Sequence, residues 1–241
     1  MRKCAALSVA VAVCLLASLT QPKAATVNWV LSSPQNTDPG TSETFSATVG
    51  LNTYTLNAKG YSYTGAITSN NFTAIDLYNK FTNADPSETG LGINNDPANN
   101  HEIYTNTFVR LDVTTARSQG LGNFSFSFGS TTQGEAWEVF GSTAANTGLT
   151  LLVGPNANDQ GNTYFLSDKN GSNQAYDFYY FVYDGPTSGC GGCNVLLTSF
   201  GGDIIPGGHQ GDTPLPAALP MFAGGLGALT LLARRKKRKV I

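Results

Sequence analysis

Strict alternation of apolar and polar residues is the feature that most constrains the fold of this chain. Residues 124–128 read Phe-Ser-Phe-Ser-Phe, and residues 109–113 read Val-Arg-Leu-Asp-Val. Because successive side chains of a β-strand point to opposite faces, each segment predicts a half-buried strand with one apolar and one polar face. These two segments therefore favour a sheet structure.

Short apolar or aromatic segments recur along the chain, and turn residues such as Gly129, Gly154 and Pro155 separate them. Residues 74–81 are compatible with a short helix or another strand, since periodicity cannot decide at this length. Many short strands with turn-rich links predict an all-β fold, a jelly-roll-like β-sandwich. Further strands are expected over residues 27–31, 44–49, 54–56, 59–63, 137–140, 149–153, 164–166, 178–183 and 195–200.

The N-terminal segment differs in composition from this strand-rich part. A short basic start is followed by an apolar stretch over residues 4–20, and Ala24 and Ala25 follow a few residues later. This is the pattern of an export signal, so we expect residues 1–25 to be a signal peptide and the mature chain to begin near Thr26. The alternative is a permanent anchor, but about 17 apolar residues are short for a membrane-spanning helix of about 20.

The C-terminal segment contains a second apolar stretch, which a basic run follows. Residues 215–233 are uncharged, and at about 1.5 Å per residue they span about 28 Å, close to the roughly 30 Å hydrocarbon core of a bilayer. We therefore expect a single transmembrane helix here. The basic run holds the tail in the cytoplasm and leaves the preceding chain outside. It comprises Arg234, Arg235, Lys236, Lys237, Arg238 and Lys239.

A proline motif precedes this apolar stretch. Residues 213–217 read Thr-Pro-Leu-Pro-Ala, and together with the apolar stretch and the basic run they resemble the PEP-CTERM sorting domain, in its variant that opens Val-Pro-Leu-Pro-Ala. Thr213 stands where that variant usually has Val. The resemblance implies that an exosortase, a membrane-embedded cysteine protease, cuts the chain near this motif. It also implies that four residues are substrate residues of that protease: Pro214, Leu215, Pro216 and Ala217.

These expectations divide the chain into four parts. They are a signal peptide (1–25), a β-sandwich ectodomain (26–200), a Gly-rich flexible spacer (201–213) and the sorting signal (214–239). As the resemblance implies, the chain would be exported across the inner membrane and anchored there transiently by its C-terminal helix. It would then reach the cell surface or the extracellular matrix.

Basic residues are concentrated at the two ends of the chain. Residues 26–213 contain five basic residues against all 16 acidic ones, a net charge of −11, whereas the full chain carries −2. Such a domain lacks the basic footprint that nucleic acid needs, so no nucleic-acid partner is expected. No cofactor is expected either. Calcium stays open, because residues 159–162 and 168–173 form oxygen-rich loops, although neither fits the EF-hand pattern.

Known catalytic motifs do not occur in the sequence. His101 and His209 are the only histidines, and neither G-x-S-x-G nor H-E-x-x-H is present. We interpret His101 and Glu102, in an Asn-rich segment, as a solvated pair. Glu135 and Glu138 are three residues apart, so on a strand they point to opposite faces and do not form a glycosidase pair. We expect Glu135 on the surface, and we do not expect an enzyme.

Two functions remain, both without catalysis. The first is a component of the extracellular matrix or biofilm, or an adhesin, with exopolysaccharide as a candidate partner. The second is a carbohydrate-binding module with a defined glycan site. In that case Trp137 and the tyrosine-rich residues 176–183 would form a sugar-stacking platform, whereas core packing is the other explanation for these rings.

Cys190 and Cys193 are the only cysteines beyond the N-terminal segment. Export to an oxidising compartment favours a disulfide between them, since a thioredoxin-like motif needs a helix at Cys190 and zinc needs two further ligands. We predict that the purified exported protein shows no free thiol before reduction and two after it, measured by thiol titration. Free, zinc-binding thiols in the native protein would contradict the disulfide.

Overall fold

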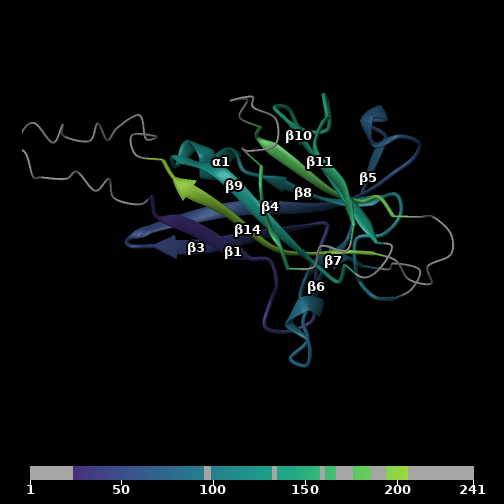
Figure 1. Ribbon diagram of the computed structural model, residues 1–241, viewed down its shortest axis with the longest axis horizontal. Helices are drawn as coiled ribbons and strands as arrows, with labels where there is room; N and C mark the ends of the chain where they lie inside the picture. Colours follow the sequence, from purple (N-terminus) through teal and green to yellow (C-terminus); the bar gives the residue numbers. More distant parts are fainter. Residues whose placement is uncertain are drawn as a thin grey trace, which may run out of the picture.

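The chain forms an all-β fold, as the alternating segments predict. In the computed structural model the described residues are 24–94, 99–131, 135–157, 161–166, 176–185 and 194–205. They form two antiparallel sheets that share one core (Figure 1), which confirms the all-β, two-sheet architecture expected from the sequence. Within these ranges no helix has both the length and the apolar character needed to cross a membrane.

The described residues contain two sheets of seven strands each, sheet A and sheet B. Sheet A has the strand order β12-β9-β14-β7-β6-β2, and its seventh strand, β1, also pairs with β14. Sheet B has the order β11-β10-β13-β8-β4-β3, and β5 pairs with β4. The strands of sheet A are β1 (Thr26–Val30), β2 (Thr37–Gly40), β6 (Leu77–Lys80), β7 (Gly90–Ile93), β9 (Leu121–Gly129), β12 (Thr163–Phe165) and β14 (Leu196–Ile204). Those of sheet B are β3 (Ser42–Val49), β4 (Asn52–Tyr63), β5 (Phe72–Ile75), β8 (Thr107–Asp112), β10 (Ala136–Ser142), β11 (Thr150–Ala157) and β13 (Phe178–Tyr183). The helical turns are η1 (Ile67–Ser69), η2 (Pro86–Glu88) and α1 (Thr114–Ser118).

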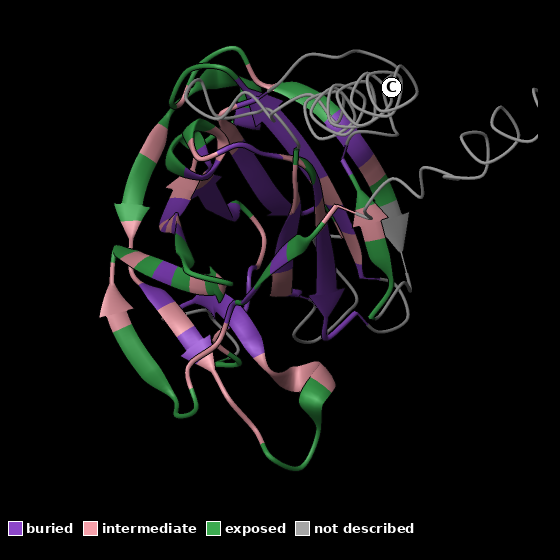
Figure 2. Ribbon diagram, turned by 90° about the vertical axis from the view of Figure 1, so that its left-hand side faces the viewer, coloured by how far each residue is buried: buried purple, intermediate pink, exposed green. Residues whose placement is uncertain are grey.

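Aromatic rings from both sheets form the centre of the core. The centroid of the Phe126 ring in β9 lies 5.4 Å from that of Trp137 and 5.2 Å from that of Phe181, both in sheet B. These pairs are edge to face, an arrangement that the charge distribution of aromatic rings favours. Figure 2 shows the buried residues in purple, concentrated on strands in the interior of the view. A few large side chains therefore connect the two sheets.

The two alternating segments lie in β9 and β8. Phe126 and Phe128 of β9 are buried between the sheets, as predicted. In β8, Phe108 and Arg110 are buried as well as Val109. The prediction of a half-buried strand is therefore wrong for β8, because a second hydrophobic cluster covers the outer face of sheet B.

Several strand boundaries differ from the expected ones. The strands expected at residues 54–56 and 59–63 are one strand, β4. Residues 74–81 contain the end of β5 and all of β6, so they are extended and not helical. The short strands β2, with sequence Thr-Asp-Pro-Gly, and β7, with Gly-Leu-Gly-Ile, were not expected. Their Gly, Pro and Asp residues are depleted in strands, so pairing with neighbouring strands overrides local preference here.

The last described strand is longer than expected. β14 runs to Ile204, so residues 201–204, which begin the expected spacer, belong to sheet A instead. Gly201 lies opposite Asn28 of β1, and a Cβ atom at Gly201 would be 2.6 Å from the Asn28 Oδ1 atom. The glycine that suggested a flexible spacer thus permits close packing of two strands. Residues 206–213 of the expected spacer lie outside the described residues.

The first and last strands bring the two ends of the domain together. Thr26 of β1 lies opposite Asp203 of β14, and the Thr26 hydroxyl donates a hydrogen bond of 2.9 Å to Asp203 Oδ1. The Ile204 backbone N–H donates to the Ala25 carbonyl at 2.8 Å. In Figure 1 the start of β1 and the end of β14 lie toward the left. We call this the proximal end of the sandwich, and the opposite end, where β14 begins, the distal end.

We predict that Phe126→Ala lowers the free energy of unfolding by about 3–5 kcal/mol, because it removes a buried ring and leaves a cavity between the sheets. Chemical denaturation of the purified protein measures the loss. Phe165→Ala is the matched control, since Phe165 lies in the same sheet but is 48% exposed. The control should cost about 1 kcal/mol or less. Equal losses for the two variants would contradict the assigned core.

Candidate functional site

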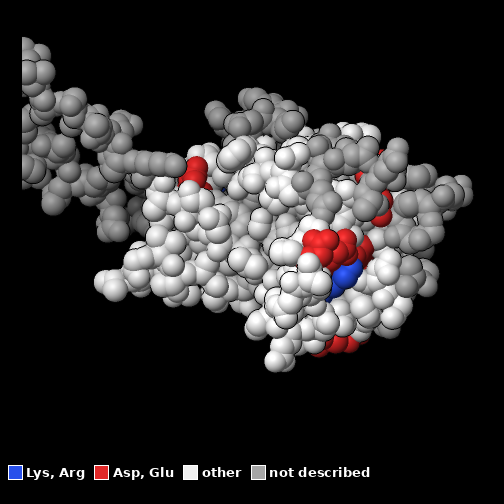
Figure 3. Space-filling view, turned by 60° about the horizontal axis from the view of Figure 1, so that its bottom comes forward, with Lys and Arg blue, Asp and Glu red and all other residues white. Residues whose placement is uncertain are grey.

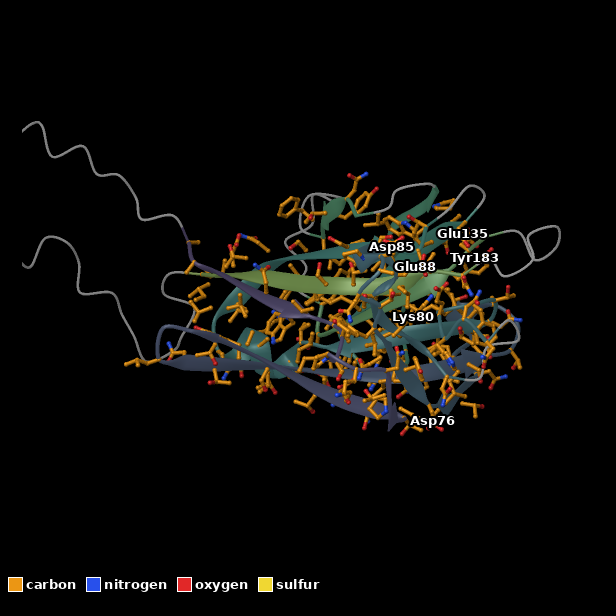
Figure 4. The ribbon with its side chains drawn as sticks, turned by 90° about the horizontal axis from the view of Figure 1, so that it is seen from below. Asp76, Lys80, Asp85, Glu88, Glu135 and Tyr183 are labelled. Atoms are coloured by element: carbon orange, nitrogen blue, oxygen red, sulfur yellow. The ribbon has the colours of Figure 1, made fainter. Side chains whose placement is uncertain are left out.

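A group of charged and polar side chains lies toward the distal end of sheet A. It comprises Lys80 at the end of β6, Glu88 at the end of η2, Glu102 in the segment before β8, and Ser130 directly after β9. We call these four residues the Lys80 cluster. Figure 4 labels Lys80 and Glu88, which lie in the half of the molecule away from the chain ends.

Local backbone structure brings Glu88 beside Lys80. Asp85 caps the η2 turn, since its carboxylate accepts hydrogen bonds from the Ser87 backbone N–H at 3.0 Å and from the Ser87 hydroxyl at 2.5 Å. The turn leads into β7, which pairs with β6 so that Gly90 lies opposite Lys80. Glu88 is two residues before Gly90, so its side chain reaches the Lys80 ammonium.

A close backbone approach fixes Glu102. Ile103 and Val195 exchange two backbone hydrogen bonds of 2.8 and 3.0 Å, which tie the segment after Glu102 to the start of β14. At Gly92 in β7, a Cβ atom would lie 2.1 Å from the His101 carbonyl oxygen and 2.7 Å from the Glu102 Cα atom. Glycine is therefore required at this place. The Glu102 side chain is only 2% exposed.

Lys80 bridges two carboxylates. Its Nζ atom lies 2.7 Å from Glu88 Oε2, and it also donates a hydrogen bond to Glu102 Oε1. The Ser130 hydroxyl donates to the same Glu102 oxygen at 3.0 Å. Two carboxylates thus share one ammonium group, and the Lys80 cluster carries excess negative charge when all its groups are ionised.

Burial and the neighbouring charged groups together set the pKa values in the Lys80 cluster. Burial raises the pKa of Glu102 to about 7, although Lys80 opposes the rise, and the charge of Glu88 adds to it. For Lys80, burial acts to lower the pKa, but hydrogen bonds to Glu102 and Glu88 outweigh burial and raise it. For Glu88, burial acts to raise the pKa, but hydrogen bonds to Lys80 and Ser130 and the charge of Lys80 together outweigh burial and lower it. Glu102 is therefore the group that takes up a proton near neutral pH.

The chemistry of the Lys80 cluster favours a structural role. A carboxyl group that titrates near pH 7 has the protonation behaviour of a general acid or base. Structural ion-pair networks shift pKa values in the same way, however, and Glu102 is buried and bonded to Lys80 and Ser130. The cluster ties β6, η2, the end of β9 and the segment before β8 to one another. It fixes the distal loops in place.

The interpretation of His101 and Glu102 as a solvated pair is wrong for Glu102, which is buried. The His101 ring stacks on Tyr78 of β6, with 3.8 Å between the ring centroids. No spacing rule in the sequence connects Glu102 with Lys80, because sheet pairing brings them together and neither lies within a known motif. The sequence does show that Lys80 is one of only five basic residues in residues 26–213.

Other candidate residues are buried as well. Trp137 is completely buried against Phe126, which confirms core packing and excludes a sugar-stacking platform at this residue. The expectation that Glu135 lies on the surface is wrong, because Glu135 is 4% exposed. Its Oε1 atom accepts a hydrogen bond of 3.2 Å from the Asn194 backbone N–H. Figure 4 labels Glu135 near Tyr183, toward the distal end.

Some predicted site residues cannot be placed, because they lie outside the described residues. These are the sorting motif Pro214, Leu215, Pro216 and Ala217, the basic run Arg234 to Lys239, Cys190 and Cys193, the loop 168–173 and residues 159 and 160 of the loop 159–162. In the ranges that the structure describes, no group of three or more His, Cys, Asp or Glu side chains is arranged to hold a metal ion.

The chain matches no protein-family model, and no curated protein sequence is similar to it. The resemblance of residues 213–239 to the PEP-CTERM sorting domain therefore stays a prediction from the sequence.

We predict that Glu102 makes the protein less stable as the pH rises from about 4.5 to about 7. The pKa of Glu102 is about 7 in the folded state and 4.5 ordinarily. The folded state therefore holds more protons in this window, and stability falls as the pH rises through it. Between these pH values, wild type should lose up to about 3 kcal/mol more stability than Glu102→Gln. Denaturation curves across this range measure the difference, and parallel pH profiles for the two proteins would contradict it.

Proposed function

We propose that this chain is a non-catalytic exported protein of the bacterial cell surface or extracellular matrix, sorted by an exosortase-like membrane protease. The order of three sequence elements carries the proposal: the proline motif at residues 214–217, the apolar stretch after it and the basic run at residues 234–239. An apolar stretch closed by basic residues halts in the membrane, which presents the motif at the outer surface. The ectodomain then serves as a matrix component or adhesin.

The position of the chain ends supports this proposal. β1 and β14 lie side by side, so the chain enters and leaves the sandwich at the proximal end. β14 has nine residues, and at about 3.3 Å per residue it places the distal end about 30 Å away. A sandwich tethered through the residues after Ile204 would therefore present its distal loops away from the membrane.

The charge of the domain also supports an extracellular role. Figure 3 shows a face of the molecule on which Lys and Arg atoms occupy only a small area. Lys80 and Arg117 are paired with carboxylates, and Arg110 is buried. A surface with so little free positive charge has little attraction for nucleic acid, while its negative charge favours solubility.

The jelly-roll relationship is part of the same proposal. Sheet A joins strands that are distant in the sequence, since β14 pairs with both β1 and β9. Pairing of strands that are distant in the sequence also occurs in Greek-key and jelly-roll sandwiches. Such a scaffold can display binding loops or pack into a matrix without any catalytic centre.

We predict that replacing Pro214, Leu215 and Pro216 together with Ala leaves the chain exported but uncleaved in the inner membrane. The apolar stretch and the basic run are unchanged in this variant, so insertion should persist while recognition by the protease is lost. Cell fractionation and immunoblotting of the released and membrane-bound forms measure the outcome.

The matched control is Pro206→Ala, which changes a proline outside the motif but in the same part of the chain. It should be cleaved and released like wild type. Equal release of the triple variant and wild type would rule out the proposed sorting.

A further inference from the structure

A second hydrophobic cluster lies on the outer face of sheet B, away from the core between the sheets. Along each strand of a two-sheet sandwich, residues that face the core alternate with residues that face outward, and the outward-facing residues are ordinarily polar. Here the outer face of sheet B is mainly aromatic. Where such an apolar surface is accessible, it indicates a binding site. The cluster comprises Tyr61, Ile67, Phe108, Phe140, Tyr180 and Val182, with Tyr63, Phe72, Leu149 and Phe178 partly buried against them.

Two segments cover most of this cluster. Ile67 in the η1 turn packs on it from one side. The β10–β11 connection covers the other side, where the Asn146 backbone N–H donates a hydrogen bond of 2.7 Å to the Tyr180 hydroxyl. Tyr63 and Phe72, which lie opposite each other in β4 and β5, remain only half-buried. These two rings form one accessible edge of the cluster, and Leu149 and Phe178 are half-buried as well.

Two carboxylates border the same edge. Glu138 is two residues from Phe140, and Asp184, whose backbone N–H continues the ladder to β10, is two residues from Val182. Both carboxylates therefore share the outer face with the aromatic cluster. The strand register brings them toward Tyr63, because Glu138 lies opposite Val182, Val182 opposite Phe108, and Phe108 opposite Tyr61, two residues before Tyr63. After the larger effect of burial, the charges of Asp184 and Glu138 also raise the pKa of Tyr63.

Neither carboxylate is neutralised within the described part of the chain. The ion pairs there join Lys80 to Glu88 and Glu102, and Arg117 to Asp177. Asp184 is exposed and Glu138 is half-buried. The edge thus combines two accessible aromatic rings with two carboxylates that make no ion pair among the described residues, in a segment (26–213) with a net charge of −11. We call Tyr63, Phe72, Glu138 and Asp184 the Tyr63 edge.

We propose that the Tyr63 edge binds a polymer of 2-amino sugars that carry free ammonium groups. The apolar face of a pyranose ring would stack on Tyr63 or Phe72, and the ammonium group would lie between Glu138 and Asp184. Aromatic rings attract both apolar surfaces and cations, and the carboxylates complement the charge. A neutral glycan would leave the carboxylates without partners, and a simple cation would leave the rings unused. The inference rests on the matrix role proposed above and names its ligand class.

Isothermal titration of the full chain, purified in mild detergent, tests this inference. The probe is a glucosamine oligomer, titrated at a pH where its amines are protonated, beside the fully N-acetylated oligomer of equal length and at equal ionic strength. The glucosamine oligomer should bind at least tenfold more tightly than the acetylated one. Asp184→Asn and Tyr63→Leu should each weaken its binding at least fivefold, while thermal melting confirms that both variants fold.

Two matched controls separate a defined site from general attraction between a cationic polymer and an acidic protein. Asp76→Asn removes one negative charge from the turn between β5 and β6, and Phe165→Leu removes an exposed ring from sheet A. Both should bind within twofold of wild type. Equal weakening by Asp76→Asn and Asp184→Asn, equal binding of the two oligomers, or no binding would overturn the inference. The proposed sorting is tested separately, by release of the protein from cells. A failure of glucosamine binding would therefore overturn this inference without bearing on the sorting result.

Discussion

Edge-to-face packing of aromatic rings between the two sheets holds this structure together. Phe126 contacts Trp137 and Phe181 across the interface, and all three are almost fully buried. Large rings supply much of the buried apolar area, at roughly 25 cal/mol per Å², in a chain with few charged residues. Strand register and loop position follow from this contact, because a shift of one residue in β9 would turn Phe126 toward solvent.

The distal end needs a different kind of support. There the short strands β6 and β7 carry few large side chains, and the Lys80 cluster joins them to the segment before β8 and to the end of β9. Removing one partner of such a buried group leaves a charge without compensation, which is more costly than the pair is stabilising. The distal loops thus rest on an electrostatic contact, whereas the centre of the sandwich rests on apolar burial.

Sequence reasoning succeeded where a local pattern reports directly on structure. The alternation around Phe126 identified a core strand, and the composition identified an all-β fold. It failed where a distant segment decides the outcome. Phe108 and Arg110 are buried because other segments cover sheet B, and Glu102 is buried because sheet pairing brings Lys80 to it. Gly201 was expected to belong to a Gly-rich spacer, but it pairs with Asn28 of β1 and is part of strand β14.

In the proposed function, β1 and β14 bring both ends of the sandwich to the proximal end, and a membrane protease would remove the C-terminal segment that follows. Intact-mass spectrometry of the protein released by cells tests this claim most directly. It should show a chain that begins near Thr26 and ends near the motif at residues 214–217, without the basic run at residues 234–239. A released protein that retains the apolar stretch and the basic run would contradict the account.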